Sequence, residues 1–375
     1  MSVHQSKIEH LITELCPNGV EFKELGKVCK IETGKLNANA AVSDGEYMFF
    51  TTAKEPSKID RYRWDTEALL IAGNANVGEV KHYIGKFEAY QRTYVLTNFS
   101  EDVHVRFLFF SLSDSLKKYL ENHTNSAAMT YIVLSTLQNF KIPVPPLDIQ
   151  QEIVKILDTF TELEAELEAE LEARKKQYEH YRDSLLVSSD ERATIYKLGT
   201  IAKNLDSRRK PVTRSARKSG DIPYYGASGI VDHVSDYLFD GNYLLISEDG
   251  ANLLARSTPI AFSITGKTWV NNHAHILKFQ SATTQRFVEI YLNSIDLSSY
   301  ISGATQPKLN QENLNRIEIP LPSLSEQERI VKILDKFDAL VNDISIGLPA
   351  ELSARRQQYE YYRNKLLTFN EYAKQ

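Results

Sequence analysis

Two stretches of the chain carry apolar residues at intervals of three and four positions, the spacing that builds one apolar face on an α-helix. The first lies within 148–186 and the second within 325–367. The second pattern is interrupted by Gly347-Leu348-Pro349. Because proline suits the first turn of a helix but not its interior, we expect one unbroken helix in the first stretch and a broken or kinked helix in the second.

The entry to each predicted helix is marked by prolines and then by two polar residues in capping-box spacing. Asp148 and Gln151 stand in these positions in the first copy, and Ser325 and Glu328 in the second. A side-chain oxygen at the first position can accept a hydrogen bond from a free backbone N–H of the first turn. We therefore expect both helices to start in the same way.

The two helices belong to a long internal repeat. IPVPPLDIQQEIVKILDTF at 142–160 returns as IPLPSLSEQERIVKILDKF at 319–337, with an offset of 177. ARKKQYEHYRDSLL at 173–186 returns as ARRQQYEYYRNKLL at 354–367, with an offset of 181. Such matches at half the chain length indicate a duplication in which each half is a variable block followed by a repeated helical block.

The duplication predicts four segments. We expect a first globular block, a first helical spacer, a second globular block and a second helical spacer, with the bounds 1–141, 142–187, 188–318 and 319–375. Each spacer needs a cover for its apolar face. Either it packs on its own globular block, or the two spacers pack on each other as an antiparallel pair. We favour the second arrangement, which gives an α+β chain with pseudo-two-fold symmetry.

The first spacer contains an acidic tandem unit. The sequence TELEAELEAELEAR at 161–174 repeats Ala-Glu-Leu-Glu twice, starting at Ala165. One four-residue unit adds about 6 Å of helix and about 40° of rotation. DNA turns by about 35° per base pair. A change in the number of units would therefore move a globular block by roughly one step along a duplex, although the segment is equally well explained as a solvated acidic face.

The globular blocks carry strand patterns that end in glycine-rich turns. ALLIAGNANVGEV at 68–80 and YLLISEDGANL at 243–253 are the clearest examples, and we interpret Glu248-Asp249 ahead of Gly250 as turn residues. Loops on a strand scaffold are where binding specificity usually lies. We therefore expect two mixed α/β blocks whose loops carry the function.

Composition bounds the class of protein. The 375 residues have a net charge of −5, with 42% hydrophobic and 25% charged residues. These are ordinary globular values. The two cysteines, Cys16 and Cys29, cannot build a disulfide framework, and no signal peptide or run of about 18 apolar residues is present. We expect a cytoplasmic protein with no membrane segment.

These motifs together resemble the specificity (S) subunits of type I restriction-modification systems. The resemblance covers nearly the whole chain and rests on the two IP-x-P-x-L-x-x-Q helices that end in QYE-x-YR-x-x-LL. It also rests on segments of the globular blocks, listed here: LCPNGVEFKELGKV at 15–28, IYKLGTIA at 195–202, IPYYGASGIVDHV at 222–234, YLLISEDGANL at 243–253 and KTWVNNHAHIL at 267–277.

The resemblance implies a DNA sequence-specificity subunit whose two blocks are target-recognition domains. Each domain would read one half of a bipartite target in double-stranded DNA, and the helices would set the spacer between the halves. It also implies that two methylation subunits dock on the helices, and that restriction subunits join the full complex.

In the second block, a basic run and three polar segments are the candidate DNA contacts. The run RRKPVTRSARK contains six cations and no acid, as phosphate contacts require; a mobile solvated loop is the alternative. Base reading needs amide, imidazole or cationic side chains on a rigid element. The candidates in this block are Arg208, Arg209, Lys210, Arg214, Arg217, Lys218, Ser228, Asn271, Asn272, His273 and Lys308.

In the first block, the candidates lie in two segments, TTAKEPSKIDRYRW at 51–64 and EAYQRTYVL at 88–96. The first segment is rich in cations and the second carries an amide beside a guanidinium. The candidate residues are Lys54, Lys58, Arg61, Arg63, Gln91 and Arg92.

The sequence indicates no catalytic residues, no metal site and no cofactor. GKT at 266–268 lacks the upstream glycine of a phosphate-binding loop, because Ala261 stands there. His273 and His275 share one strand face in the predicted alternation, yet no cysteine or carboxylate spacing completes a metal set. A stand-alone restriction or methylating enzyme, and a helical adaptor that does not touch DNA, are the alternatives to a non-catalytic subunit.

Overall fold

The structure is a computed structural model that describes residues 2–122, 131–188, 193–303 and 305–372. The chain divides into two compact units. Unit 1 consists of residues 1–168 and 352–375, and unit 2 of residues 169–351. The boundary of 168 and 169 falls inside the acidic tandem unit of the first spacer, so each unit contains one half of each helical spacer. The predicted four-segment bounds stay a prediction.

Unit 1 contains a six-stranded sheet in the order β2-β7-β5-β6-β3-β4. Strands β3 and β6 are parallel, and the other neighbours are antiparallel. Its elements are α1 (Ser2–Leu15), β1 (Glu21–Glu24), α2 (Leu25–Val28), β2 (Lys30–Thr33), η1 (Ala38–Ala40), β3 (Tyr47–Phe50), β4 (Ser57–Ile59), β5 (Trp64–Ala72), β6 (Val80–Ala89), β7 (Thr93–Thr97), α3 (Val105–Asn122), α4 (Leu134–Gln138), β8 (Lys141–Val144) and the first part of α5 (Leu147–Ser188). The last part of α11 (Leu348–Leu367) completes it.

Strand β5 shows why this sheet is buried on both faces. Its Leu69 and Ile71 pack with Leu108 and Leu112 of α3, while Leu70 between them packs in a second cluster on the opposite face. Successive side chains of a strand point to opposite faces, so an unbroken apolar run such as ALLIA fills two cores.

Unit 2 has two smaller sheets, in the orders β10-β17-β14-β15 and β12-β11-β16-β13. The first has the order of β2-β7-β5-β6 in unit 1, and the second has that of β4-β3-β6-β5, with the same parallel and antiparallel pairs. Its elements are β9 (Thr194–Lys197), α6 (Leu198–Ile201), β10 (Ala202–Asn204), η3 (Asp206–Arg208), η4 (Arg214–Ala216), β11 (Ile222–Gly226), β12 (Gly229–Val234), β13 (Phe239–Asp240), β14 (Tyr243–Ser247), α7 (Asn252–Ala255), β15 (Ala261–Ile264), β16 (Lys267–Val270), β17 (Ala274–Phe279), α8 (Ala282–Ser294), η5 (Ser298–Tyr300), α9 (Gln311–Arg316), β18 (Glu318–Leu321) and α10 (Leu324–Asn342). The last part of α5 and the first residues of α11 complete it.

The two globular blocks therefore share one fold. Helices α3 and α8 take the same place after the last sheet strand, and the pairs β1–β8 and β9–β18 are both antiparallel. The expected α+β fold with two mixed α/β blocks is confirmed. The sequence showed repetition only in the spacers. The structure extends the repetition to the blocks, because the two blocks have the same strand order although their side chains differ.

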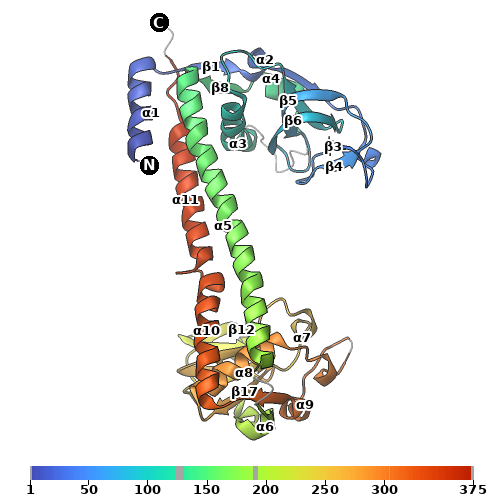
Figure 1. Cartoon of the computed structure of the whole chain (residues 1–375), viewed down its shortest axis with the longest axis vertical. Helices are drawn as coiled ribbons and strands as arrows, with labels where there is room; N and C mark the ends of the chain where they lie inside the picture. The colour runs from blue at the N-terminus through green and yellow to red at the C-terminus, as the bar shows by residue number, and fades with distance from the viewer. Residues whose placement is uncertain (1, 123–130, 189–192, 304, 373–375) are drawn as a thin grey trace. The chain divides into compact units, whose positions relative to one another are not determined.

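Within unit 1, the first part of α5 runs antiparallel to the last part of α11 (Figure 1, green and red). Phe160 stacks on Tyr362 with ring centroids 5.6 Å apart, and Arg356 contacts Glu164 at 2.6 Å and also Glu168. Partner numbers fall along α11 as those on α5 rise, which establishes the antiparallel direction.

Within unit 2, the last part of α5 contacts α10 through the corresponding residues. Tyr181 stacks on Phe337 with ring centroids 5.5 Å apart. Phe337 is Phe160 shifted by 177, and Tyr181 is Tyr362 shifted by 181 in the opposite direction. The predicted pairing of the spacers is thus confirmed in each unit, and both units use the same pair of repeated positions.

The spacers also pack on their own blocks, so the two arrangements weighed from the sequence coexist. In unit 1, Ile149 and Ile153 of α5 are buried against Phe107 of α3. In unit 2, Ile330 and Leu334 of α10 are buried in the core of the block. The start of each repeat is therefore block-facing, and the aromatic positions further along are helix-facing.

The expected helix starts are wrong in detail. Helix α10 begins at Leu324 and is capped by Ser323, whose Oγ accepts from the N–H of Glu326, and not by Ser325 with Glu328. Helix α5 begins at Leu147, so Asp148 lies in its first turn rather than at the cap. The prolines fix the entry, because the residue before a proline is held extended.

A buried glutamine has the same role in both copies. Gln150 Nε2 donates to the carbonyl of Pro145 at 2.7 Å, and Gln327 Nε2 donates to that of Pro322 at 2.7 Å. A buried amide needs such partners. This bond explains the glutamine at the end of the repeated IP-x-P-x-L-x-x-Q motif.

The predicted interruption of the second spacer is confirmed. Helix α10 ends at Asn342 and α11 begins at Leu348, with Pro349 in its first turn. Asp343 Oδ1 accepts from the N–H and the hydroxyl of Ser345 and so stabilises the turn between the two helices.

None of the described helices combines the length and the hydropathy needed to cross a lipid bilayer.

Candidate nucleic-acid interface

In unit 2, three separate chain segments meet at the end of β14. The N–H of Glu248 donates to the carbonyl of His273 at 2.9 Å, and the N–H of Leu309 donates to the carbonyl of Glu248 at 2.8 Å. Two of these segments carry sequence candidates, namely Asn271 to His273 and Lys308. The backbone bonds therefore gather residues that are far apart in the sequence.

The exposed side chains at this place are polar or charged. His273 Nδ1 lies 2.8 Å from Asp249 Oδ2, and Lys308 Nζ lies 3.1 Å from Glu248 Oε1. Asn272 is exposed. Asp249, interpreted from the sequence as a turn residue, is thus also a direct neighbour of a candidate.

Asn271 and Ser228 differ in exposure. Asn271 is only 7% exposed, and its Oδ1 accepts from the N–H of His273 at 2.8 Å. It shapes the turn and presents little to a ligand. Ser228 is exposed in the turn between β11 and β12. In the same turn, the hydroxyl of Ser247 donates to the carbonyl of Ala227.

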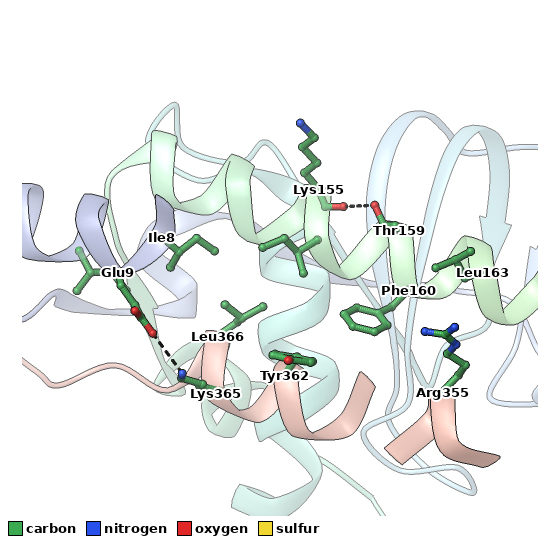
Figure 2. A pocket seen from close by; sticks show the side chains of 12 residues that line it. Ile8, Glu9, Lys155, Thr159, Phe160, Leu163, Arg355, Tyr362, Lys365 and Leu366 are labelled. Atoms are coloured by element: carbon green, nitrogen blue, oxygen red, sulfur yellow. Dashed lines mark hydrogen bonds and ion pairs between the residues drawn. The ribbon is translucent and has the colours of Figure 1, made fainter. Parts of the chain in front are cut away.

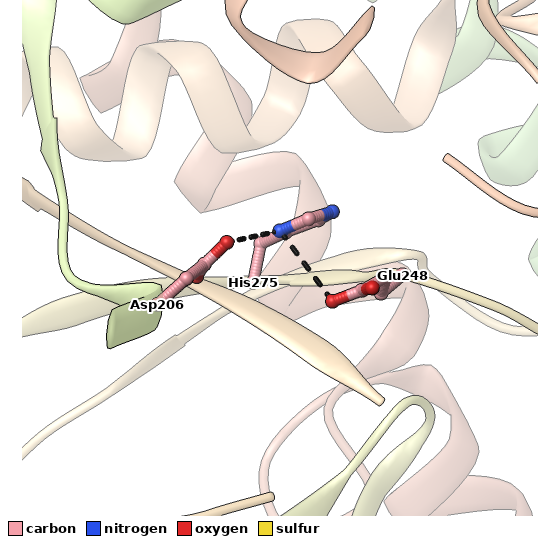
Figure 3. Close-up of side chains that lie close together, drawn as sticks. All are labelled: Asp206, Glu248 and His275. Atoms are coloured by element: carbon pink, nitrogen blue, oxygen red, sulfur yellow. Dashed lines mark hydrogen bonds and ion pairs between the residues drawn. The ribbon is translucent and has the colours of Figure 1, made fainter. Parts of the chain in front are cut away.

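A buried charged cluster supports this end of β14 (Figure 3). His275 Nδ1 lies 2.6 Å from Asp206 Oδ2 and 3.8 Å from Glu248 Oε2. Arg209 Nη1 contacts the same Glu248 oxygen at 2.6 Å. Burial acts to raise the pKa of Asp206 and that of Glu248. Bonds from His275, the N–H of Ile276 and Asn204 nevertheless lower the pKa of Asp206, and Arg209, His275 and Lys308 lower that of Glu248.

This cluster is an internal ion network. Its three ligand-type groups have atoms within 4.8 Å of one another. Arg209, however, already neutralises Glu248, and buried carboxylates are stable when paired in this way. Sequence reasoning placed both histidines on one strand, whereas His275 lies in β17 and His273 in the turn before it.

The predicted basic run is divided between structural and exposed roles. Arg209 belongs to the cluster, and Arg217 contacts Asp232 at 2.9 Å while lying over the ring of Tyr224. Arg208 is exposed and lies over Phe239. Lys210, Arg214 and Lys218 are also exposed.

In unit 1, the candidates lie around the edge strands and the turn between β6 and β7. Gln91 and Arg92 form that turn, and Gln91 Nε2 donates to Asn37 Oδ1 at 2.8 Å. Arg63 lies over the ring of Trp64 and 3.6 Å from Glu32. The remaining exposed candidates are Lys54, Lys58 and Arg61.

The turn of Gln91 and Arg92 is the counterpart of the turn of Asn272 and His273. The N–H of Gly73 donates to the carbonyl of Arg92 at 2.8 Å, as the N–H of Glu248 does to that of His273. The two segments, AYQRTY and VNNHAH, share no motif, so the hydrogen bonds and not the sequence identify the turns as equivalent.

A separate apolar pocket lies on the helices of unit 1 (Figure 2). Its cavity volume is about 270 Å³, and α1, α5 and α11 contribute its lining. Leu163 is 40% exposed there, Lys155 and Arg355 also line the pocket, and Lys365 lies 3.3 Å from Glu9 at its edge. An apolar hollow with basic side chains around it is typical of a protein-contact surface.

Comparison with known proteins gives consistent matches. Residues 17–173 and 191–354 match the family model described as the type I restriction modification DNA specificity domain. A putative type I restriction enzyme specificity subunit of Haemophilus influenzae is 40% identical over 178 residues, which are 46% of this chain and 46% of that protein, so the match spans about half the length of that relative. The EcoR124I/EcoR124II specificity subunit of Escherichia coli is 33% identical over 273 residues, 63% of this chain and 65% of that protein.

Solved structures show the same fold. The crystal structure of a type I restriction-modification S subunit from M. genitalium covers 93% of this chain and 96% of its own, with a TM-score of 0.62 and 17% identity. A chain from a study of complex assembly in the type I R-M system covers 94% of this chain and 98% of its own, with a TM-score of 0.59 and 15% identity.

Proposed function

This chain belongs to the family of type I restriction-modification DNA specificity proteins, and on that premise we propose that it is the non-catalytic subunit that directs a methylation and restriction complex to a bipartite DNA target. Each globular block reads one half of the target. The observation that carries the proposal is the repeated fold, in which equivalent turns hold Gln91 and Arg92 in one block and Asn272 and His273 in the other.

The DNA contacts divide into two kinds. The exposed cations Lys54, Lys58, Arg61, Lys210, Arg214, Lys218 and Arg208 contact phosphates, which attract any cation. The turns read base edges, because amide, imidazole and guanidinium groups form bonds that distinguish base pairs. Arg209, Arg217 and Asn271 position their neighbours, since each is largely buried and already bonded within the protein, and Arg63 is held against Trp64 and Glu32.

The helices set the gap between the two half targets. Helix α5 has 42 residues, which correspond to about 63 Å at 1.5 Å per residue. The equivalent ring pairs of Phe160 with Tyr362 and of Phe337 with Tyr181 support a spacer in which each unit pairs its helices through the same repeated positions.

The helical surface is also where two methylation subunits dock, and restriction subunits join the complex through them. The apolar pocket formed by α1, α5 and α11 supports this assignment, because an exposed apolar hollow favours contact with an apolar face of a partner. Methyl transfer and DNA cleavage belong to those partners, and this chain supplies specificity.

The test is to express the full chain with its type I methylation subunit and to map adenine methylation across the host genome. A motif of two fixed halves separated by a constant gap is expected. A continuous palindrome, or a map that does not change when this chain is expressed, would refute the proposal. Binding of S-adenosylmethionine by the purified chain alone would instead revive the enzyme hypothesis.

A further inference from the structure

The register of the backbone bonds identifies matching positions in the two blocks beyond the turns already described. Asn74 forms an isolated bridge with Tyr131, and Asp249 forms one with Lys308. The N–H of Ile132 donates to the carbonyl of Gly73 at 2.7 Å, as that of Leu309 does to Glu248 at 2.8 Å. Asn74 therefore corresponds to Asp249, and Tyr131 to Lys308.

The same carbonyl is anchored in both blocks by chemically different donors. The hydroxyl of Tyr94 donates to the carbonyl of Ile132 at 2.8 Å, and His275 Nε2 lies 2.7 Å from the carbonyl of Leu309. Tyr94 and His275 are each the second residue of the last sheet strand. The position of the bridged segment is thus kept although the side chain that holds it has changed.

In contrast, the side chains presented by this framework differ completely between the blocks. One set is Asn74, Arg92 and Tyr131, and the other is Asp249, His273 and Lys308. Tyr131 is 52% exposed, so its ring is available to a ligand. A conserved backbone arrangement that carries different polar side chains is expected where two blocks recognise different sequences.

Two local features single out Asn74. Its Oδ1 is buried and has no hydrogen-bond partner within the described residues, although a buried amide oxygen is normally satisfied. The next residue, Ala75, has a φ of 54°, a left-handed conformation that is costly for a residue with a Cβ. Backbone strain and an unsatisfied amide at one turn are typical of a functional loop.

We propose that Asn74 and Tyr131 in unit 1, and Asp249 in unit 2, are specificity-determining residues of the half target that their own block reads. The inference rests on the proposed function. An asparagine amide recognises adenine, a carboxylate accepts from the amino group of cytosine, and a tyrosine ring contacts the thymine methyl or a base face. Lys308 and His273 complete the set in unit 2.

The experiment uses the full chain co-purified with its methylation subunit and three duplexes. They are the mapped target, the target with its first half altered, and the target with its second half altered. The readout is the ratio of affinities for the intact and altered duplexes. The variants are Asn74→Ala, Tyr131→Leu and Asp249→Ala, with Ile84→Ala as a control, because Ile84 is 67% exposed on β6 away from this turn.

Asn74→Ala and Tyr131→Leu are expected to lower discrimination against one altered half by about 5- to 150-fold, which corresponds to one base contact. Discrimination against the other half is expected to stay unchanged, and Asp249→Ala should show the reverse pattern. The control variant should discriminate both halves as the unaltered chain does.

Three results would overturn the inference while the proposed function stands. In the first, all three variants discriminate both halves like the unaltered chain. In the second, each variant has an equally reduced affinity for the duplexes altered in either half and for random duplex, which indicates a general loss of binding or folding. Thermal unfolding of each variant then identifies a folding defect. In the third, substitutions in both units affect the same half. Failure of the unaltered chain to discriminate either half would instead refute the proposed function.

Discussion

Arg92 offers the most direct test of base reading by a single residue. Its backbone carbonyl accepts from Gly73, so a substitution of the side chain leaves that bond in place. Arg92→Ala is expected to reduce the free energy of binding to the half target read by unit 1 by about 1–3 kcal/mol. Competition binding with singly altered duplexes measures this loss. Equal loss for the specific target and for random duplex would assign Arg92 to phosphate contact instead.

The charged cluster around Glu248 predicts a pH-dependent contribution to stability. Burial acts to raise the pKa of Glu248, but bonds from Arg209 and Lys308 and the charge of His275 lower it. Because the folded pKa is lowered, the stabilisation is present above the unfolded value of about 4.3 and is lost as the pH falls through the folded value.

Glu248→Gln is therefore expected to lower the free energy of unfolding by about 1–3 kcal/mol at pH 7. The difference from the unaltered chain should shrink as the pH falls below the unfolded pKa of about 4.3 towards the lowered folded pKa, because protons then bind the unfolded carboxyl before the folded one. Denaturant titrations at pH 7, 5 and 3.5 measure the difference. A difference that is constant over this range would show that the charge of Glu248 does not contribute.

At the scale of elements, the tandem acidic unit of α5 sets the register of the spacer. Arg356 of α11 contacts Glu164 and Glu168. Deletion of Ala165–Glu168 would bring Glu172 to the place of Glu168, because the unit is repeated, and would shorten the helix by about 6 Å. Methylation maps are expected to show a changed gap with both halves unaltered. A change in either half would contradict the spacer role of this segment.

The pocket on α1, α5 and α11 yields a prediction about assembly. Leu163→Glu places a charge in the apolar pocket at a residue that is 40% exposed, so folding should tolerate it. It is expected to reduce co-purification of the methylation subunit at least about tenfold, as loss of a central apolar contact does. Ile84→Glu, at a residue that is 67% exposed on β6 and outside the helices, is the control. Equal recovery with both variants would remove the pocket from the interface.

At the scale of the whole molecule, the repeated fold predicts that specificity is modular. Replacement of residues 188–318 by the corresponding block of another family member should change one half of the methylated motif and leave the other half and the gap unchanged. The reason is that the second block has its own sheets and core within unit 2. A methylation map in which both halves change would show that the blocks do not read DNA independently.

The periodicity and the repeat determined much of this protein without coordinates. Apolar spacing located α5 and the interruption at Gly347-Leu348-Pro349, because helix geometry and proline chemistry act within a few residues. The offset of 177 also predicted equivalent helices, and the ring pairs confirm their antiparallel contact within each unit. The helix caps were misplaced by two residues in α10, because several polar residues compete for that position.

Only the tertiary structure decided which candidates are available to DNA. Arg209 and Asn271 have the chemistry of base readers, yet both are held inside the protein by Glu248 and by the N–H of His273. Tyr131 carried no sequence signal and is brought beside Asn74 by a bridge across more than fifty residues. Local spacing fixes which faces a segment presents, but burial and long-range hydrogen bonds depend on partners that the sequence order does not place together.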